Sequence, residues 1–168
     1  MTDIRTLIFD GESLSPPYFD YQLKTSQLEA DDGLATAVIL SLFTNRLAND
    51  DDVLPNGSDD KRGWWADAYP DIAGDNIGSR LWLLEREKDE QSVVNLAREY
   101  AEEALQWMLD DGVASRVDVV AGWVESSGVI VEVKTATVFK GMLAIGVDIH
   151  RPDGSTAQFR FDNFWNQL

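Results

Sequence analysis

Glu90-Gln-Ser-Val-Val-Asn-Leu-Ala-Arg-Glu-Tyr-Ala-Glu-Glu-Ala-Leu-Gln-Trp-Met-Leu-Asp110 is the stretch that decides the fold. Its hydrophobic side chains project within one half of a helical wheel, and polar, mostly acidic side chains fill the other half. The hydrophobic half consists of Val93, Val94, Leu96, Ala97, Tyr100, Ala101, Ala104, Leu105, Trp107 and Met108. This pattern predicts one long amphipathic helix with a face in the core, and Gly112 is well placed to end it.

Beyond Gly112 the hydrophobic period changes from helical to alternating. Four alternating runs cover residues 117–123, 129–133, 143–149 and 157–161, and turn-forming residues stand between them. Alternation predicts strands with one buried face, and short turns between such strands indicate an antiparallel sheet. A long amphipathic helix before this sheet predicts an α+β fold in two layers, with the long helix and shorter helices packed on a mainly antiparallel C-terminal sheet.

The chain before residue 45 predicts three further elements. Residues 4–9 and 18–23 are rich in aromatic and β-branched side chains, which indicates short strands or an extended arm within residues 1–30. Residues 33–44 carry a wide apolar arc at helical spacing, and the preceding Asp31 and Asp32 suit a helix N-terminus. A buried strand remains the alternative for this apolar run.

Between residue 45 and the long helix the sequence predicts a loop and a short helix. Residues 49–63 combine turn formers with a charge run and have little to bury, which predicts a surface loop. The aspartates of this loop are not in the register of an EF-hand calcium site. Residues 76–85 are expected to form a short helix.

Length and composition favour a single domain over residues 1–168. No stretch approaches the roughly 20 uninterrupted apolar residues of a membrane span, and the N-terminus lacks a secretory pattern, so we expect synthesis in a cytoplasm. Thirty acidic against fourteen basic residues give a formal net charge of -16, which argues against a nucleic-acid partner. The acidity serves either solubility or contact with a basic surface in an assembly.

The residue types offer little for catalysis. There is no cysteine, and His150 is the single histidine, so neither a thiolate zinc site nor a second imidazole is available. The phosphate-binding glycine patterns are missing as well, and we therefore expect no cofactor, no metal and no enzyme. A peptidoglycan hydrolase using a carboxylate pair is the alternative, although Glu85 and Glu87 flank Arg86 and so suit an ion pair better than a general acid.

Bulky aromatic and arginine side chains in the middle of the chain indicate contact with other macromolecules, because these residue types dominate tightly held interfaces. Trp82 fits a helix core equally well. At the C-terminal end, Phe164 and Trp165 lie past the last alternating run and are further contact candidates. The predicted partner-binding set is Arg62, Trp64, Trp65, Asp67, Arg80, Trp82, Glu85, Arg86, Phe164 and Trp165.

Three segments, taken in order, resemble the Mu-like phage baseplate protein family, the gene product 46 family. They are Leu34-Ala-Thr-Ala-Val-Ile-Leu-Ser-Leu-Phe-Thr-Asn-Arg46, Arg62-Gly-Trp-Trp-Ala-Asp67 and Gly78-Ser-Arg-Leu-Trp-Leu-Leu84. The resemblance covers about residues 4 to 150 and places the chain near the sheath initiators of contractile tails, once called lysozyme-like. The matching pattern positions are Gly63, Trp64, Trp65, Asp67, Gly78, Ser79, Arg80, Leu81, Trp82 and Leu84.

The resemblance implies a structural, non-catalytic component of a contractile tail baseplate in the virion, assembled in the bacterial host cytoplasm. Such a protein joins the wedge around the central hub and templates the first sheath ring. The implied partners are other wedge proteins, the tail sheath protein and the central hub or spike. Members of the broader class often carry a Glu-Pro-Arg element for the wedge; this chain has only Glu85-Arg86-Glu87 as a loose counterpart.

Overall fold

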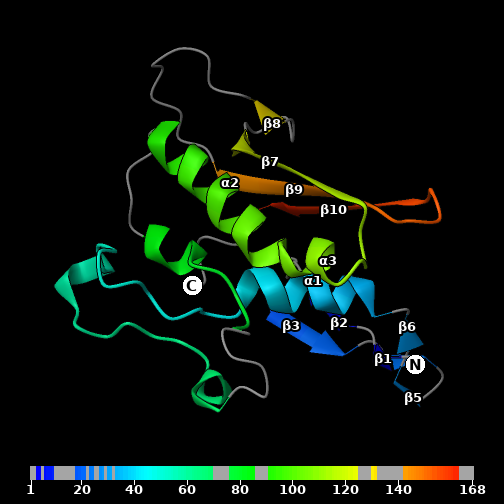
Figure 1. Ribbon diagram of the computed structural model, residues 1–168, viewed down its shortest axis with the longest axis horizontal. Coiled ribbons are helices and arrows are strands. Elements are labelled where there is room, and N and C mark those ends of the chain that lie inside the picture. The colour runs from blue at the N-terminus through cyan, green and yellow to red at the C-terminus, as the bar shows by residue number, and fades with distance from the viewer. Residues whose placement is uncertain are drawn as a thin grey trace.

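The computed structural model describes the chain over residues 3–4, 6–9, 18–21, 23–24, 27–28, 30–31, 33–69, 76–85, 91–124, 130–131 and 142–162. It confirms the α+β class: α2 (Gln91–Leu105) lies along the C-terminal sheet, and α1 (Leu34–Phe43) packs against α2 (Figure 1). The core is continuous, because buried side chains of the helices and of the sheet join in one cluster.

The predicted C-terminal sheet has four strands, β7 (Arg116–Val124), β8 (Ile130–Val131), β9 (Met142–His150) and β10 (Thr156–Asp162). All pairs are antiparallel, as predicted, and the spatial order is β10-β9-β7-β8. The alternating residues face the core: Val119, Ala121 and Trp123 of β7 are buried, and so are four of β9, namely Leu143, Ile145, Val147 and Ile149. In β7 and β9 alternation therefore identified the inner face of the sheet correctly, while the side chains of the run 129–133 lie outside the described residues.

The long helix exists but is broken near its end. α2 covers Gln91–Leu105 and α3 covers Trp107–Asp110, and Gln106 N–H donates to Glu103 O, three residues back, at the junction. The chain then ends its helical run at Gly112, whose φ of 70° is left-handed, as predicted. The prediction that Leu96 and Trp107 face the core is wrong: each side chain is 36% exposed, because both lie at the border of the apolar arc.

α1 (Leu34–Phe43) confirms the helix predicted over 33–44 and removes the strand alternative. It contacts α2 and β2 and buries Leu34, Val38 and Leu42. Gly33 is the N-cap residue of this helix. Asp32 and the side chain of Asp31 lie outside the described residues, so their predicted role at the helix N-terminus stays a prediction.

The N-terminal residues form short antiparallel pairs, as the strand prediction for this region expected. β2 (Thr6–Phe9) pairs with β3 (Tyr18–Tyr21). The remaining two-residue strands pair as β1 (Asp3–Ile4) with β6 (Ala30–Asp31) and β4 (Leu23–Lys24) with β5 (Gln27–Leu28).

The described residues between α1 and α2 contain three short 3-10 helices, η1 (Pro55–Gly57), η2 (Trp65–Ala68) and η3 (Leu81–Leu84). The helix predicted over 76–85 is therefore only half right. Gly78 has a φ of 97°, and Ser79 forms a parallel bridge with Asn45, so the first half of this segment is extended. Within the described ranges, every helix is too short or too polar to cross a membrane.

Candidate docking surface

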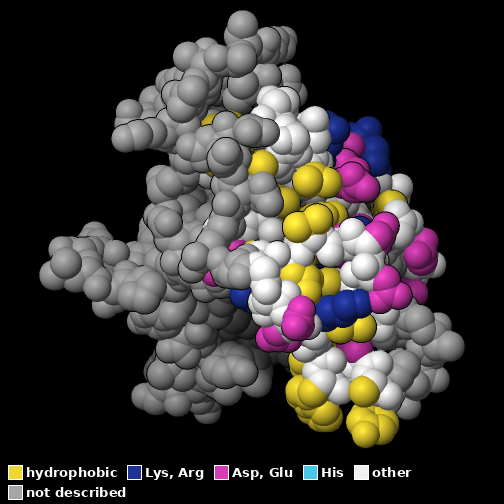
Figure 2. Space-filling view, turned by 90° about the vertical axis from the view of Figure 1, so that its left-hand side faces the viewer, with side chains coloured by type: hydrophobic (Ala, Val, Ile, Leu, Met, Phe, Trp, Pro, Cys, Tyr) yellow, Lys and Arg dark blue, Asp and Glu magenta, His cyan; other side chains and the backbone are white. Residues whose placement is uncertain are grey.

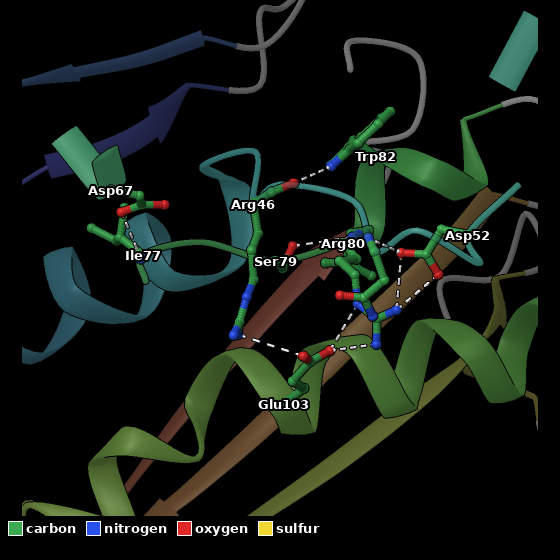
Figure 3. Close-up of polar contacts among 10 residues, drawn as sticks. Arg46, Asp52, Asp67, Ile77, Ser79, Arg80, Trp82 and Glu103 are labelled. Atoms are coloured by element: carbon green, nitrogen blue, oxygen red, sulfur yellow. Dashed lines mark hydrogen bonds and ion pairs between the residues drawn. The ribbon is translucent and has the colours of Figure 1, made fainter. Parts of the chain in front are cut away.

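Arg80 is held by partners from its own chain. Its guanidinium donates to Asp52 at 2.9 Å and to Glu103 of α2 at 2.8 Å, and its Cζ lies 4.5 Å from the centre of the Tyr100 ring (Figure 3). Glu103 also pairs with Arg46 at 3.5 Å. Arg80 therefore joins the loop after α1 to α2 and positions its neighbours, and its predicted contact with a partner stays a prediction.

Burial shapes the electrostatics of this network. Burial lowers the pKa of Arg80, but its hydrogen bonds to Glu103 and Asp52 outweigh that effect, and the net shift is upward from the ordinary value. Burial also raises the pKa of the Tyr100 phenol, although the adjacent Arg80 charge opposes the shift. Both shifts keep the network in one charge state, a cation over a neutral ring, at ordinary pH.

The loop prediction over 49–63 needs one correction here. Most of the loop is exposed, as expected, and Val53 is 84% exposed. Asp52, however, has a side chain only 10% exposed, because it receives Arg80. Sequence reasoning missed Asp52, since the surrounding run of aspartates contains no signal that singles it out.

Trp82 belongs to the core, which settles the choice left open by the sequence. It is 2% exposed, and its Nε1 donates to Arg46 O at 2.8 Å. Arg62 lies over the Trp82 ring at 4.6 Å from the ring centre and pairs with Glu85 at 2.9 Å. Three of the predicted contact residues, Arg62, Trp82 and Glu85, therefore contact one another.

Gly78 and Ser79 attach this segment to the end of α1. Ser79 N–H donates to Thr44 O at 2.9 Å, and Arg46 N–H donates to Ser79 O at 3.0 Å. Ser79 Oγ also donates to Leu42 O. A Cβ at Gly78 would lie 2.3 Å from Thr44 O, so only glycine permits this approach.

Trp64 and Trp65, by contrast, present aromatic surface outward. Trp65 is 77% exposed, Trp64 is half exposed, and their rings stack obliquely with centroids 5.8 Å apart. Tyr69, at the end of the same turn, is also largely exposed. Figure 2 shows hydrophobic side chains gathered at the lower end of this face of the molecule. We call Trp64, Trp65 and Tyr69 the aromatic patch.

Beside the aromatic patch is a pocket of about 330 Å³, built by α1, residues 64–67, residues 76–78 and the end of the long helix. Asp67 lies in its wall and accepts a hydrogen bond from Ile77 N–H at 3.3 Å (Figure 3). Trp107 forms another wall and donates from Nε1 to Ser41 Oγ at 3.0 Å. Sequence reasoning placed Trp107 in the core and did not identify Tyr69 as a contact residue. The position of Trp107 at the edge of the apolar arc was the one signal that could have indicated its exposure.

Arg86, Phe164 and Trp165 lie outside the described residues. Of the predicted contact set, the structure brings Arg62, Trp82 and Glu85 together in one cluster and links Arg80 to α2. Trp64 and Asp67 line the pocket, and the ring of Trp65 lies beside the ring of Trp64.

The acids of the sheet are already engaged in polar contacts. Asp118 and Asp148 are cross-strand neighbours beside a hollow on the sheet. Asp118 pairs with Arg116 and with His150, and Asp148 accepts from Gln158 at 3.0 Å. Both carboxylates therefore already have polar partners at the surface, whereas glycoside hydrolysis needs an acid and a base separated across a substrate cleft. In the described part of the chain no group of three potential metal ligands gathers.

Comparison with known proteins defines the class. The family model for phage protein GP46 matches residues 34–156, which include the helices, the Arg80 network and most of the sheet, and the chain belongs to this family. The baseplate protein gp46 of Escherichia phage Mu is 42% identical over 136 residues, covering 81% of this chain and 82% of that protein. A Mu-like prophage protein, FluMu gp46 of Haemophilus influenzae, is 36% identical over 166 residues and 99% of both chains.

Proposed function

We propose that this protein is a structural component of a contractile phage or prophage tail baseplate, and that it performs no catalysis. It joins the baseplate wedge around the central hub or spike and offers the first ring of the sheath protein a template. Its place is the virion baseplate, after assembly in the host cytoplasm.

The observation that carries this proposal is the similarity to two relatives, one from a phage and one from a prophage, over most or nearly all of the chain. The relative from phage Mu is named a baseplate protein, and the prophage relative matches over 99% of both chains. Similarity over the whole length supports a shared role more strongly than a shared segment would, because the surfaces as well as the core are covered.

The aromatic patch supports a role in assembly. Trp and Tyr side chains supply large contact area at interfaces, and clustered exposed aromatics are characteristic of binding surfaces. Trp65 is 77% exposed and Tyr69 is 83% exposed, so neither contributes appreciably to this chain's own core. We assign this patch to the wedge contact. Arg80, Arg62, Trp82 and Glu85 act behind it by fixing the segments that carry it.

The edge of the sheet is the second proposed contact. Among the described strands, β10 is the last one in the sheet order, and edge strands pair readily with an extended segment from another chain. We propose that a sheath subunit adds such a segment here, with Phe164 and Trp165 flanking it, and that Arg86 contributes to the wedge contact.

The proposal is tested by Trp65→Ala in tails assembled from a phage lacking its own copy and complemented in trans. We expect the variant to fold normally, because the indole is exposed, and to be depleted from purified tails by tenfold or more, on the order of one interface hot spot. Immunoblotting of purified tails and electron microscopy of baseplates measure the outcome. Val53→Ala is the matched control, because it also removes an exposed apolar side chain, and it should be incorporated normally.

Two results would count against the proposal. If the wild-type protein is missing from purified tails, the baseplate assignment is wrong. If it is present and Trp65→Ala enters as well as Val53→Ala does, the aromatic patch is not the wedge contact. Release of sugar fragments from peptidoglycan by the purified protein would instead support the hydrolase alternative.

A further inference from the structure

We propose that the pocket beside Trp64 receives an arginine side chain from a partner protein. This inference rests on the proposed function, because it supplies the chemistry of one contact within the baseplate. The residues that line the pocket include Ala37, Leu40, Trp64, Asp67, Ile77 and Trp107.

The orphan carboxylate oxygen of Asp67 is the first observation. Among the described residues, Asp67 Oδ2 is the only buried side-chain oxygen or nitrogen that has no hydrogen-bond partner. A buried acceptor without a donor costs free energy, and a charged acceptor costs more than a neutral one. The other oxygen, Oδ1, accepts from Ile77 N–H, and Asp67 is one of the residues that line the pocket, so one unpaired carboxylate oxygen lies buried at the pocket wall.

Pre-organisation of the walls is the second observation. Trp107 is oriented by its hydrogen bond to Ser41, and Trp64 O accepts from Asp67 N–H at 3.1 Å, which fixes the turn that carries both side chains. The backbone at Gly78 packs closely against Thr44, which fixes the position of this part of the pocket wall. A site built in this way binds without ordering its own side chains, so less free energy is lost on binding.

Charge and aromatic content decide the occupant. A carboxylate and two indole side chains, Asp67, Trp64 and Trp107, line the same pocket, which favours a cation that also stacks, and a guanidinium does both. The protein uses the same combination twice internally: Arg62 lies on Trp82 and pairs with Glu85, and Arg80 lies on Tyr100 and pairs with Glu103. The net charge of -16 favours a basic partner segment over an acidic one.

The size of the pocket suits a side chain on a protein segment. A volume of about 330 Å³ lies at the lower end for ligand sites, and the exposed Leu40 and Trp65 extend apolar surface beyond the pocket. An arginine followed by an apolar residue therefore satisfies Asp67 inside the pocket and covers the aromatic patch outside it.

Two dipeptides test this inference on the full-length protein. Acetyl-arginyl-leucine amide is titrated in one arm, and acetyl-citrullyl-leucine amide, which replaces the guanidinium by a neutral urea of the same shape, in the other. Heteronuclear NMR follows the Trp64 and Trp107 indole N–H groups and the Ile77 amide. We expect the arginine peptide to shift these three signals with a dissociation constant on the order of 1 to 10 mM, and citrulline to bind at least about tenfold more weakly.

Asp67→Asn should weaken binding of the arginine peptide by about tenfold or more, because it keeps the acceptor for Ile77 N–H but removes the charge. Asp51→Asn, a loss of the same charge at an exposed site, should leave binding unchanged. Equal binding of the two peptides, unmoved Trp64, Trp107 and Ile77 signals, or an unaffected Asp67→Asn variant would each overturn the proposal. Self-association of the protein that Asp67→Asn abolishes would also overturn it, by making a second copy the occupant.

In the tail assembly assay, the outcomes separate the two proposals. Normal incorporation of Asp67→Asn together with exclusion of Trp65→Ala would leave the baseplate role standing and remove the arginine pocket. If the wild-type protein binds the peptide but is missing from tails, the arginine pocket stands and the baseplate role is removed.

Discussion

At the scale of single residues, Arg62 and Arg80 form ion pairs with carboxylates of their own chain. Arg80 has a side chain 14% exposed, and its two carboxylate partners come from the loop after α1 and from α2. Its charge was visible in the sequence, but its partners lie 28 and 23 residues away along the chain. Nothing local in the sequence therefore distinguishes an arginine that binds its own carboxylates from one that binds a partner.

Arg80→Ala should lower the free energy of unfolding by about 2 to 4 kcal/mol, because Asp52 is left nearly buried without its cation. Urea denaturation followed by tryptophan fluorescence measures the change. Arg80→Lys should recover part of the loss, since an ammonium keeps the charge but cannot form the planar fork. We expect Arg80→Ala to reduce incorporation into tails through this loss of stability.

Arg98→Ala is the control for this prediction. Arg98 and Glu102 form an exposed pair one helical turn apart, with N and O 3.9 Å from each other, and such a pair contributes below about 0.5 kcal/mol. A loss in Arg80→Ala no larger than that in Arg98→Ala would show that the Arg80 network does not stabilise the fold.

At the scale of elements, residues 76–85 show where local patterns fail. Ile77, Arg80, Leu81 and Leu84 have helical spacing, but the first half of the segment is drawn into an extended path by its bonds to Thr44 and Arg46. Only η3 remains helical, and all four of its residues are buried. Tertiary hydrogen bonds decided this element, because a short segment has little helical stability of its own.

Gly78→Ala should destabilise the protein by about 3 kcal/mol or more, because a methyl group would collide with Thr44 O in addition to straining a φ of 97°. Gly154→Ala is the matched control, since its φ is 85° but its Cβ would meet nothing within 4 Å, so only about 1 to 2 kcal/mol is expected there. Thermal unfolding of both variants measures the difference. Equal losses would mean that the approach to Thr44 is not tight in solution.

At the scale of the whole molecule, the excess of acidic residues governs association more than folding. The network arginines already have carboxylate partners, and the formal net charge is -16. A protein of this charge is expected to meet basic partner surfaces, and complementary charge accelerates encounter.

The rate of incorporation into baseplates should therefore fall as salt is raised. Between about 50 mM and 500 mM NaCl the screening length shortens severalfold, and we expect association to slow by about tenfold or more. Binding of the purified protein to tails that lack it, followed by light scattering or by pelleting at each salt concentration, measures the rate. Sodium sulfate at the same ionic strength should slow association to the same extent as NaCl. A rate of association that does not depend on salt would exclude a basic partner surface.

The sequence by itself determined the α+β class, the long helix, the inner face of the sheet and the family. These follow from hydrophobic periods and from short motifs, which are local along the chain. Only the tertiary structure decided that Trp82 is core, that Arg80 binds Asp52 and Glu103, and that Asp67 lines a pocket with Trp64 and Trp107. Each of these depends on which distant segments meet, because burial and ion pairing are properties of the folded neighbourhood and not of residue type.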